Sequence, residues 1–254
     1  MHFLKALIIA FSIYSRIPVP QFIWKERDMK YMLCFFPWVG AVIGGCLYLW
    51  FCLCQRFHVG TLCYTVVGAA IPLGITGGFH VDGFMDTMDA FHSYASRERK
   101  LEILKDSHVG AFAVIMLALY GLVYLGAFSE IGEVTLLKIV CAGFFLSRCL
   151  SGISVVSFPG AKNEGMLRSF AEGAKKRAVK WALYLQGVLC ACLMLYWSLL
   201  GGGLAVTAAL LSFAYYYYRS KKELGGITGD TAGYFVLVCE GSIIVAAAVA
   251  GRLL

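Results

Sequence analysis

The chain has 254 residues, of which 60% are hydrophobic and 15% are charged, with a formal net charge of +7. A soluble domain carries roughly a quarter charged residues, so this composition excludes an ordinary water-soluble domain. The positive charge does not indicate a nucleic-acid partner, because the lysines and arginines flank apolar runs, as topology-determining residues of membrane proteins do.

Residues 2–15 form a short apolar segment, which predicts a helix that lies in the membrane interface. The next segment, Arg16-Ile17-Pro18-Val19-Pro20, offers no small-residue cleavage site and ends a helix, because proline has no backbone N–H to donate. We therefore do not interpret residues 2–15 as a signal peptide.

Long runs with almost no charge follow, and a helix needs about 20 such residues to cross the bilayer core. The single-crossing runs are residues 31–54, 59–79, 109–129, 139–161 and 231–251. The run 181–218 is nearly twice too long for one crossing, so we expect a helical hairpin that turns at Gly201-Gly202-Gly203. The sequence thus predicts an all-α, polytopic integral membrane protein with about seven transmembrane helices, in which residues 1–254 form a single domain.

Lysine and arginine are distributed unevenly among the connecting segments. Residues 1–30, 80–108, 158–180 and 219–230 hold 18 of the 22 basic residues. By the positive-inside rule these segments face the cytoplasm, which places the amino terminus inside and the carboxyl terminus outside.

Three aspartates follow the second apolar run. Asp82, Asp86 and Asp89 are spaced i, i+4 and i+7, so a helix would project all three carboxylates from one face. Neighbouring carboxylates repel one another unless a cation lies between them, and hard oxygen donors are typical of Mg²⁺ bound together with substrate phosphates. The alternative is a solvated acidic face, which the apolar residues between the aspartates disfavour. His80 is a candidate substrate contact or a local hydrogen-bond partner.

A second polar cluster, Lys105-Asp106-Ser107, stands just before the third apolar run. Lys105 and Asp106 would hold a phosphate or extend the metal site. In the alternative interpretation, Asp106 or Ser107 caps the following helix and Lys105 anchors it at the membrane.

A glycine-rich loop, Gly225-Gly226-Ile227-Thr228-Gly229-Asp230, precedes the last apolar run. Glycines let backbone amides approach a ligand, and the start of a helix favours anions. Gly229 is therefore a candidate substrate contact and Asp230 a further metal ligand, although such loops are also common turns.

Two charges lie inside apolar runs. Arg148 and Glu240 each cost several kcal/mol in the membrane unless they are paired or hydrated. They would pair as a structural bridge or contact the substrate. Lys162, after Pro159-Gly160, would meet a phosphate or mark the membrane edge.

The acidic residues and the glycine loop fall on the same predicted side as the basic loops. A magnesium site at this surface suits the transfer of a phosphoryl-linked group. The chemistry resembles that of the enzymes that use CDP-alcohols to make phospholipids, but the Ala-Arg pair that follows their first Asp-Gly is missing here.

The order of motifs along nearly the whole chain resembles the cobalamin synthase family, adenosylcobinamide-GDP ribazoletransferase. The matching segments are Ser15 to Pro20, Phe36 to Gly40, His80 to Gly83 with Asp86 and Asp89, Lys105 to Ser107 with Gly110, and Gly226 to Asp230 with Gly233. Two positions depart from the family pattern. His108 stands where many relatives have arginine, and Leu237 stands where a glutamate is expected, while Glu240 keeps a second such position.

The resemblance implies that α-ribazole, or its 5′-phosphate, attacks the cobinamide-bearing phosphoryl group of adenosylcobinamide-GDP, with GMP as the leaving group. It also implies an inner-membrane transferase whose active site faces the cytoplasm, with Mg²⁺ held by Asp82, Asp86 and Asp89. The candidate catalytic residues are Asp82, Asp86, Asp89, Asp106 and Asp230, and the candidate substrate contacts are His80, Lys105, Ser107, Arg148, Lys162 and Gly229.

Two other functions compete with this interpretation. A lipid phosphotransferase that uses a CDP-alcohol would differ in its nucleotide preference. A multi-pass transporter would also contain intramembrane charges and glycine-broken helices, but the sequence has no inverted repeat and its acidic residues gather at one membrane face. Membrane lipid is an expected partner, and assembly into a homo-oligomer stays open.

Overall fold

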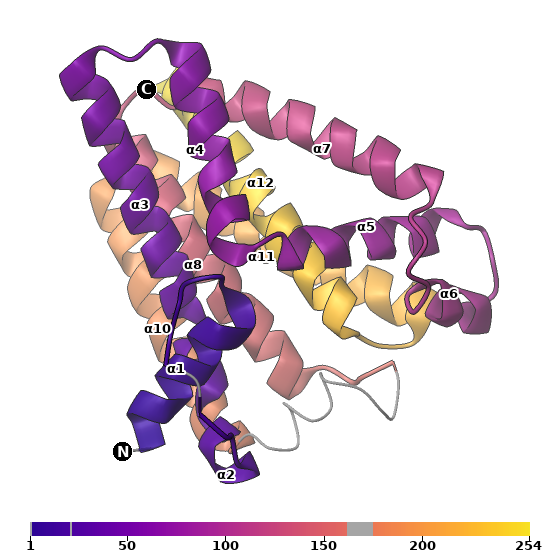
Figure 1. Ribbon diagram of the computed structural model, residues 1–254. Coiled ribbons are helices and arrows are strands. Elements are labelled where there is room, and N and C mark those ends of the chain that lie inside the picture. Colours follow the sequence, from indigo (N-terminus) through magenta and orange to yellow (C-terminus); the bar gives the residue numbers. More distant parts are fainter. Residues whose placement is uncertain (1, 21, 162–174) are drawn as a thin grey trace.

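The computed structural model describes residues 2–20, 22–161 and 175–254. Its elements are α1 (His2–Tyr14), α2 (Glu26–Met29), the 3₁₀ turn η1 (Met32–Phe35), α3 (Phe36–Phe57), α4 (Thr61–Thr76), α5 (Phe79–His92), α6 (Arg97–Ile103), α7 (Ala111–Ser129), α8 (Val134–Ser157), α10 (Lys176–Trp197), α11 (Leu199–Leu224) and α12 (Gly229–Leu253) (Figure 1). The one extended pairing in this part of the chain is an isolated bridge between Gly160 and Ile227. The predicted all-α class is confirmed.

Six of these helices are long and apolar enough to cross a membrane: η1 with α3, then α7, α8, α10, α11 and α12. Counting the bent pair α4 and α5 as one further span gives seven, in agreement with the predicted polytopic architecture. Helix α1 is apolar but shorter than these spans, so the predicted short helix is confirmed.

The second predicted span ends in a sharp bend. Helices α4 and α5 meet at 94°, and the two residues between them, Gly77 and Gly78, have positive φ values of 66° and 81°. A residue with a side chain rarely adopts this conformation. Helix α5 turns away from α4 (Figure 1), and its 14 residues extend only about 21 Å, too short to cross the bilayer. The aspartates of α5 therefore lie beyond the bend, off the axis of α4.

The predicted hairpin turn is wrong by a few residues. The chain reverses at Ser198, whose Oγ accepts a hydrogen bond of 3.0 Å from the Gly201 N–H and caps α11. Gly201 to Gly203 are helical, and a Cβ on Gly202 would overlap the Met194 carbonyl. The glycines thus permit close packing of α10 and α11 and do not form the turn themselves.

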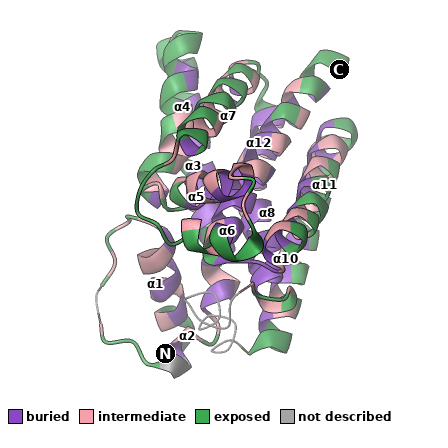
Figure 2. Cartoon of the chain, turned by 90° about the vertical axis from the view of Figure 1, so that its right-hand side faces the viewer, coloured by how far each residue is buried: buried purple, intermediate pink, exposed green. Residues whose placement is uncertain are grey.

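Helices α8 and α12 form the centre of the bundle. In the most apolar stretch of each helix, 78% of the residues of α8 and 67% of those of α12 are buried, but only 17% of those of α7. Figure 2 shows the contrast between these central helices and the exposed outer faces of α7 and α11. Large apolar side chains such as Leu122, Leu185 and Leu211 are exposed on the outer helices, as expected for surfaces that contact lipid.

The two ends of the bundle differ in charge. The α3–α4 turn lies at the same end as the carboxyl terminus, whereas the end of α8 and the start of α10 lie toward the amino terminus (Figure 1). The described residues 158–161 and 175–180, with four basic residues, are therefore opposite the lysine-poor turn, which is the arrangement that the topology prediction requires.

Candidate active site

Helix α5 carries the three aspartates on one side. Its opposite side includes Phe84 and Phe91, which are buried in the bundle. Asp82 is exposed, and Asp86 and Asp89 are partly buried. The predicted helix is therefore confirmed, and its carboxylates lie at the edge of the core.

Helix α12 crosses α5 at very close range. A Cβ on Gly83 would lie 2.7 Å from the Asp230 carbonyl oxygen, and a Cβ on Gly233 would lie 3.4 Å from the His80 Cα. Only glycine at position 83 leaves room for the backbone of α12. This contact brings Asp230, from a segment about 150 residues away in sequence, beside the first two turns of α5.

Negative charge accumulates at the crossing. Partial burial, followed by repulsion from the carboxylates of Asp82, Asp230 and Asp89, raises the pKa of Asp86 to about 6. The start of α12 opposes this charge, because the N-terminal end of a helix is the positive end of its dipole. Thr228 caps that helix and also donates to the Asp230 carboxylate at 3.4 Å.

Asp89 has a second role that the sequence analysis missed. Its carboxylate accepts hydrogen bonds from the backbone N–H groups of Gly110 at 2.6 Å and Ala113 at 2.8 Å. These are donors at the start of α7 that no residue of that helix can satisfy. Asp89 thus caps α7 from another helix. The capping residue and its donors lie more than 20 positions apart, so no local motif signals the contact.

The Lys105-Asp106-Ser107 cluster lies in an exposed loop. Asp106 accepts hydrogen bonds from the His108 backbone N–H at 3.0 Å and pairs with its ring Nδ1 at 2.6 Å. These bonds hold the pKa of the Asp106 carboxyl below its ordinary value. Helix α7 begins only after Gly110, so the alternative in which Asp106 or Ser107 caps it is wrong. Asp106 is not among the carboxylates that act on Asp86.

The predicted glycine loop is a turn followed by a helix cap. Gly225 ends α11 with a φ of 75°, and the Ile227 N–H donates to the Pro159 carbonyl at 2.9 Å. Gly229 is exposed at the first position of α12. The segment ending at residue 161 thus runs alongside the loop that leads into Asp230. Lys162, the next residue, lies outside the described residues.

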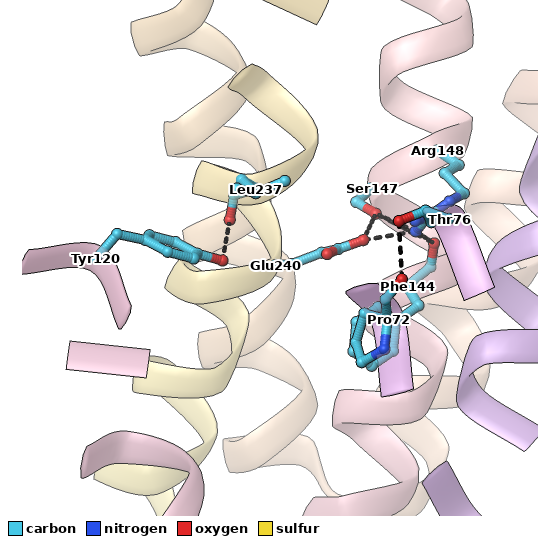
Figure 3. Close-up of polar contacts among 8 residues, drawn as sticks. All are labelled: Pro72, Thr76, Tyr120, Phe144, Ser147, Arg148, Leu237 and Glu240. Carbon is cyan, nitrogen blue, oxygen red and sulfur yellow. Dashed lines mark hydrogen bonds and ion pairs between the residues drawn. The ribbon is translucent and has the colours of Figure 1, made fainter. Parts of the chain in front are cut away.

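Arg148 and Glu240 form an ion pair, which is one of the two roles predicted for them. Arg148 Nη1 lies 2.5 Å from Glu240 Oε1, and the two side chains are 1% and 6% exposed. Ser147 Oγ donates to the same carboxylate oxygen at 3.2 Å, and Arg148 donates to the Phe144 carbonyl at 2.8 Å (Figure 3). The pair joins the two central helices.

His80 lies beside this pair. Its ring is buried near the rings of Tyr14, with centroids 6.5 Å apart, and Phe36, with centroids 5.8 Å apart. His80, Arg148 and Glu240 all line one cavity of about 290 Å³. The His80 Nε2 has no hydrogen-bond partner in the described part of the chain, so this atom does not make the local hydrogen bond that was one of its two predicted roles.

No three histidine, cysteine, aspartate or glutamate side chains among residues 2–20, 22–161 and 175–254 are grouped closely enough to hold a metal ion by themselves. Magnesium does not require such a cage, because it commonly binds one or two carboxylates and takes its other ligands from water and substrate phosphates. The magnesium site therefore stays a prediction. The donors at the α5–α12 crossing fit it, since their mutual repulsion is what a cation relieves.

A further contact joins the loops around the site. Lys100 Nζ lies 2.5 Å from Glu223 Oε2 and both side chains are largely buried, so α6 is held against the end of α11. Arg219 stacks over the Phe91 ring, with 4.9 Å between its guanidinium carbon and the ring centroid. In the sequence, Lys100 and Arg219 belong only to the positive-inside pattern. Their partners lie more than 100 positions away, so the sequence carried no signal for the pairing.

Comparison with known proteins agrees with the motif order. A family model described as cobalamin-5-phosphate synthase matches residues 6–248. The chain is 43% identical over 241 residues to the adenosylcobinamide-GDP ribazoletransferase of Lachnoclostridium phytofermentans, covering 94% of this chain and 92% of that one. It is 33% identical over 243 residues to the protein of the same name from Clostridium perfringens, covering 94% and 95%. No solved structure matches. The extent of these matches over the aspartate helix, the glycine loop and the spans shows that the chain belongs to the cobalamin-5-phosphate synthase family.

Proposed function

We propose that this protein is a magnesium-dependent adenosylcobinamide-GDP ribazoletransferase. A ribose hydroxyl of α-ribazole, or of its 5′-phosphate, attacks the phosphoryl group that bears the cobinamide, and GMP leaves. The products are adenosylcobalamin, or its 5′-phosphate, and GMP. The observation that carries the proposal is the crossing of α5 and α12. There, carboxylates from two distant segments meet beside a helix start, in a chain of this family.

Asp82, Asp86 and Asp230 would hold the magnesium ion together with the substrate phosphates. Bound there, Mg²⁺ would neutralise phosphate charge and orient the attacking and leaving oxygens. Asp89 belongs to a different part of the machinery, because its two oxygens are already bonded to the start of α7. Its contribution is to keep α7 docked against the helix that carries the ligands.

The protein supplies further charge around the phosphates. The exposed first residue of α12, Gly229, presents backbone N–H groups at the positive end of the helix dipole. Lys105 is exposed in the α6–α7 loop and free to reach a phosphate as a point charge. The proton of the attacking hydroxyl would pass to a carboxylate of the cluster, since these are the basic groups beside the reacting atoms.

The site faces the cytoplasm in this proposal, as does the amino terminus. The basic residues of the adjoining loops support this orientation through the positive-inside rule. The large apolar side chains exposed on α7, α10 and α11 would contact membrane lipid.

The test is GMP release from adenosylcobinamide-GDP by the purified protein in detergent, with α-ribazole as acceptor. We expect turnover that requires Mg²⁺ and stops when the metal is chelated. Asp82→Asn should lower this turnover at least 100-fold without loss of folded protein. The matched control is Glu102→Gln, which neutralises an exposed carboxylate 2.7 Å from Arg99, and it should keep near-normal activity.

Different outcomes separate the competing functions. Nucleotide release from a CDP-alcohol, with none from adenosylcobinamide-GDP, would indicate a lipid phosphotransferase. Uptake into vesicles without any bond cleavage would indicate a transporter. Full activity in the presence of a chelator would contradict the magnesium proposal, and full activity of Asp82→Asn would remove that residue from the site.

A further inference from the structure

A groove lies on the outer face of the bundle that α3, α8 and α10 form. Helix α8 packs against both α3 and α10, and residues of all three helices line the groove, whose volume is about 710 Å³. Ligand pockets typically measure about 300–1,000 Å³, so this groove is large enough for a lipid-sized molecule. Its described lining includes no residue of α5 or α12, so it is separate from the aspartates.

Small residues create the space in the groove. Gly44 of α3 lies directly against α8, because an added Cβ there would be 2.6 Å from the Cys141 carbonyl oxygen. At the neighbouring Gly45, an added Cβ would meet no atom within 4 Å. Cys141 and Ala142 contribute the α8 side of the lining. The two helices therefore approach closely, while no large side chain fills the hollow beside their contact.

The length of the groove matches one leaflet of a bilayer. Along α10 its lining extends from Gln186 to Trp197, a rise of about 16 Å, and along α3 it extends from Trp38 to Tyr48, a rise of about 15 Å. Half of a bilayer core is about 15 Å thick. An acyl chain that lies along these helices would therefore be accommodated over its length.

One charged residue, Lys138, lines this apolar groove. It is partly buried in the second turn of α8, near the α7–α8 turn. Its side chain forms no ion pair or hydrogen bond with the residues that the structure describes. Trp197, the last residue of α10, lines the same groove, and tryptophan is enriched at the level of the lipid headgroups. An unpaired cation at this level attracts an anionic headgroup.

A second copy of the chain would not satisfy this lysine. A twofold dimer brings the same surface of both subunits together. Lys138 is the charged residue of the groove lining, so the facing groove would supply another lysine and no carboxylate. An anionic lipid provides both the apolar chain and the missing negative charge.

We propose that this groove binds an anionic phospholipid, with an acyl chain along α3 and α10 and the headgroup phosphate at Lys138. The lipid comes from the leaflet on the side of the α7–α8 turn. It fills the space between the two helices and stabilises the folded bundle, as any ligand that binds the folded state does. This site acts independently of the transfer reaction.

Titration of the full chain in detergent with phosphatidylglycerol, followed by native mass spectrometry, measures the proposed binding. The wild type should bind one phosphatidylglycerol at least fivefold more tightly than phosphatidylcholine. Lys138→Gln should weaken phosphatidylglycerol binding about fivefold, the contribution of one lysine near a membrane surface, and leave phosphatidylcholine unchanged. Arg56→Gln is the matched control, because Arg56 is an exposed cation in the last turn of α3 and outside the groove. It should change neither affinity.

A second variant tests the acyl-chain part of the site. Gly45→Leu fills the groove and should weaken the binding of both lipids at least tenfold. Gly126→Leu is its control, because Gly126 is also exposed with open space around its Cα but lies on α7, outside the groove. This control should bind both lipids as the wild type does.

Several outcomes would overturn the proposal. A wild-type protein that binds both lipids equally rejects the headgroup contact, whether or not the variants fold. Unchanged phosphatidylglycerol affinity in Lys138→Gln rejects it as well, and unchanged lipid affinity in Gly45→Leu rejects the groove. A dimer that Gly45→Leu converts to a monomer, with lipid affinity unchanged, would assign this face to a second copy of the chain.

Discussion

At the scale of single residues, the Asp89 carboxylate of α5 caps the start of a different helix, α7. Its two oxygens accept the Gly110 and Ala113 N–H groups, and a Cβ on Gly110 would lie 2.5 Å from either oxygen. The glycine is therefore needed for the cap to close. A residue that the sequence predicts as a third metal ligand thus also joins α5 to α7.

We predict that Asp89→Ala destabilises the protein by about 1–2 kcal/mol, the range for loss of a helix cap. Asp89→Asn should lower the stability less, because an amide oxygen still accepts one of the two hydrogen bonds. Gly110→Ala should also destabilise the protein, because its Cβ would overlap the Asp89 carboxylate. Thermal unfolding in detergent measures this, with Gly126→Ala as the neutral control on α7. Loss of magnesium affinity in Asp89→Asn at unchanged stability would show that Asp89 is a ligand after all.

Asp86 makes the stability of the folded protein depend on pH. Its pKa in the folded protein, about 6, lies above the value of about 4 for an unfolded aspartate. Ionisation therefore opposes folding: the penalty is absent below about pH 4 and fully present above about pH 6. In the absence of divalent cations, Asp86→Asn should raise the unfolding temperature at pH 8 but not at pH 4.

The gain should be on the order of 1 kcal/mol, because the carboxylate is only partly buried and solvent screens its neighbours. Adding Mg²⁺ at pH 8 should stabilise the wild-type protein and reduce its difference from Asp86→Asn, since a bound cation removes the same repulsion. Equal stabilisation by Asp86→Asn at pH 4 and pH 8 would contradict this account of the cluster.

At the scale of helices, the ion pair between α8 and α12 is the main polar contact inside the bundle. Arg148 and Glu240 are almost completely buried, so removing one partner leaves the other charge unpaired at a cost of about 3–5 kcal/mol. Arg148→Met alone should therefore lower stability strongly. The double variant Arg148→Met with Glu240→Leu should recover most of the loss.

Unfolding temperatures in detergent test the stability of these variants, and GMP release tests their function. A double variant that is stable and active would make the pair a structural bridge only. A double variant that is stable but has a raised KM for α-ribazole would agree with Arg148 as a substrate contact. Equal instability of the single and double variants would contradict the ion-pair account.

At the scale of the whole molecule, the bundle has one basic end and one weakly charged end. We predict that the loop before α7 is cytoplasmic and that the α7–α8 turn is on the opposite side of the membrane. Cysteines introduced at Ser107 and Gly132, both exposed, should respond differently to a membrane-impermeant thiol reagent added to intact cells.

Only Gly132→Cys should be labelled in intact cells, and Ser107→Cys should become reactive after the cells are opened. The unsubstituted protein gives the background from the native cysteines. Labelling of Ser107→Cys in intact cells would reverse the topology and place the proposed site outside the cytoplasm.

The amino-acid sequence by itself determined the membrane class, the approximate spans and the aspartate helix, and it gave an ion pair as one of two explanations for Arg148 and Glu240. These features follow from local quantities: the length of an apolar run against the thickness of a bilayer, helical spacing, and the cost of an isolated charge in hydrocarbon. The comparisons with known proteins agree with the family that the motif order indicated.

Only the tertiary structure decided which residues meet. It moved the hairpin turn to Ser198, committed Asp89 to the start of α7, brought Asp230 against Gly83, and enclosed the cavity beside His80. Each of these depends on steric contact between segments far apart in the chain, and glycines at the contacts set the distance. Such contacts leave no periodic or compositional pattern in the sequence, because they are properties of two surfaces and not of either segment alone.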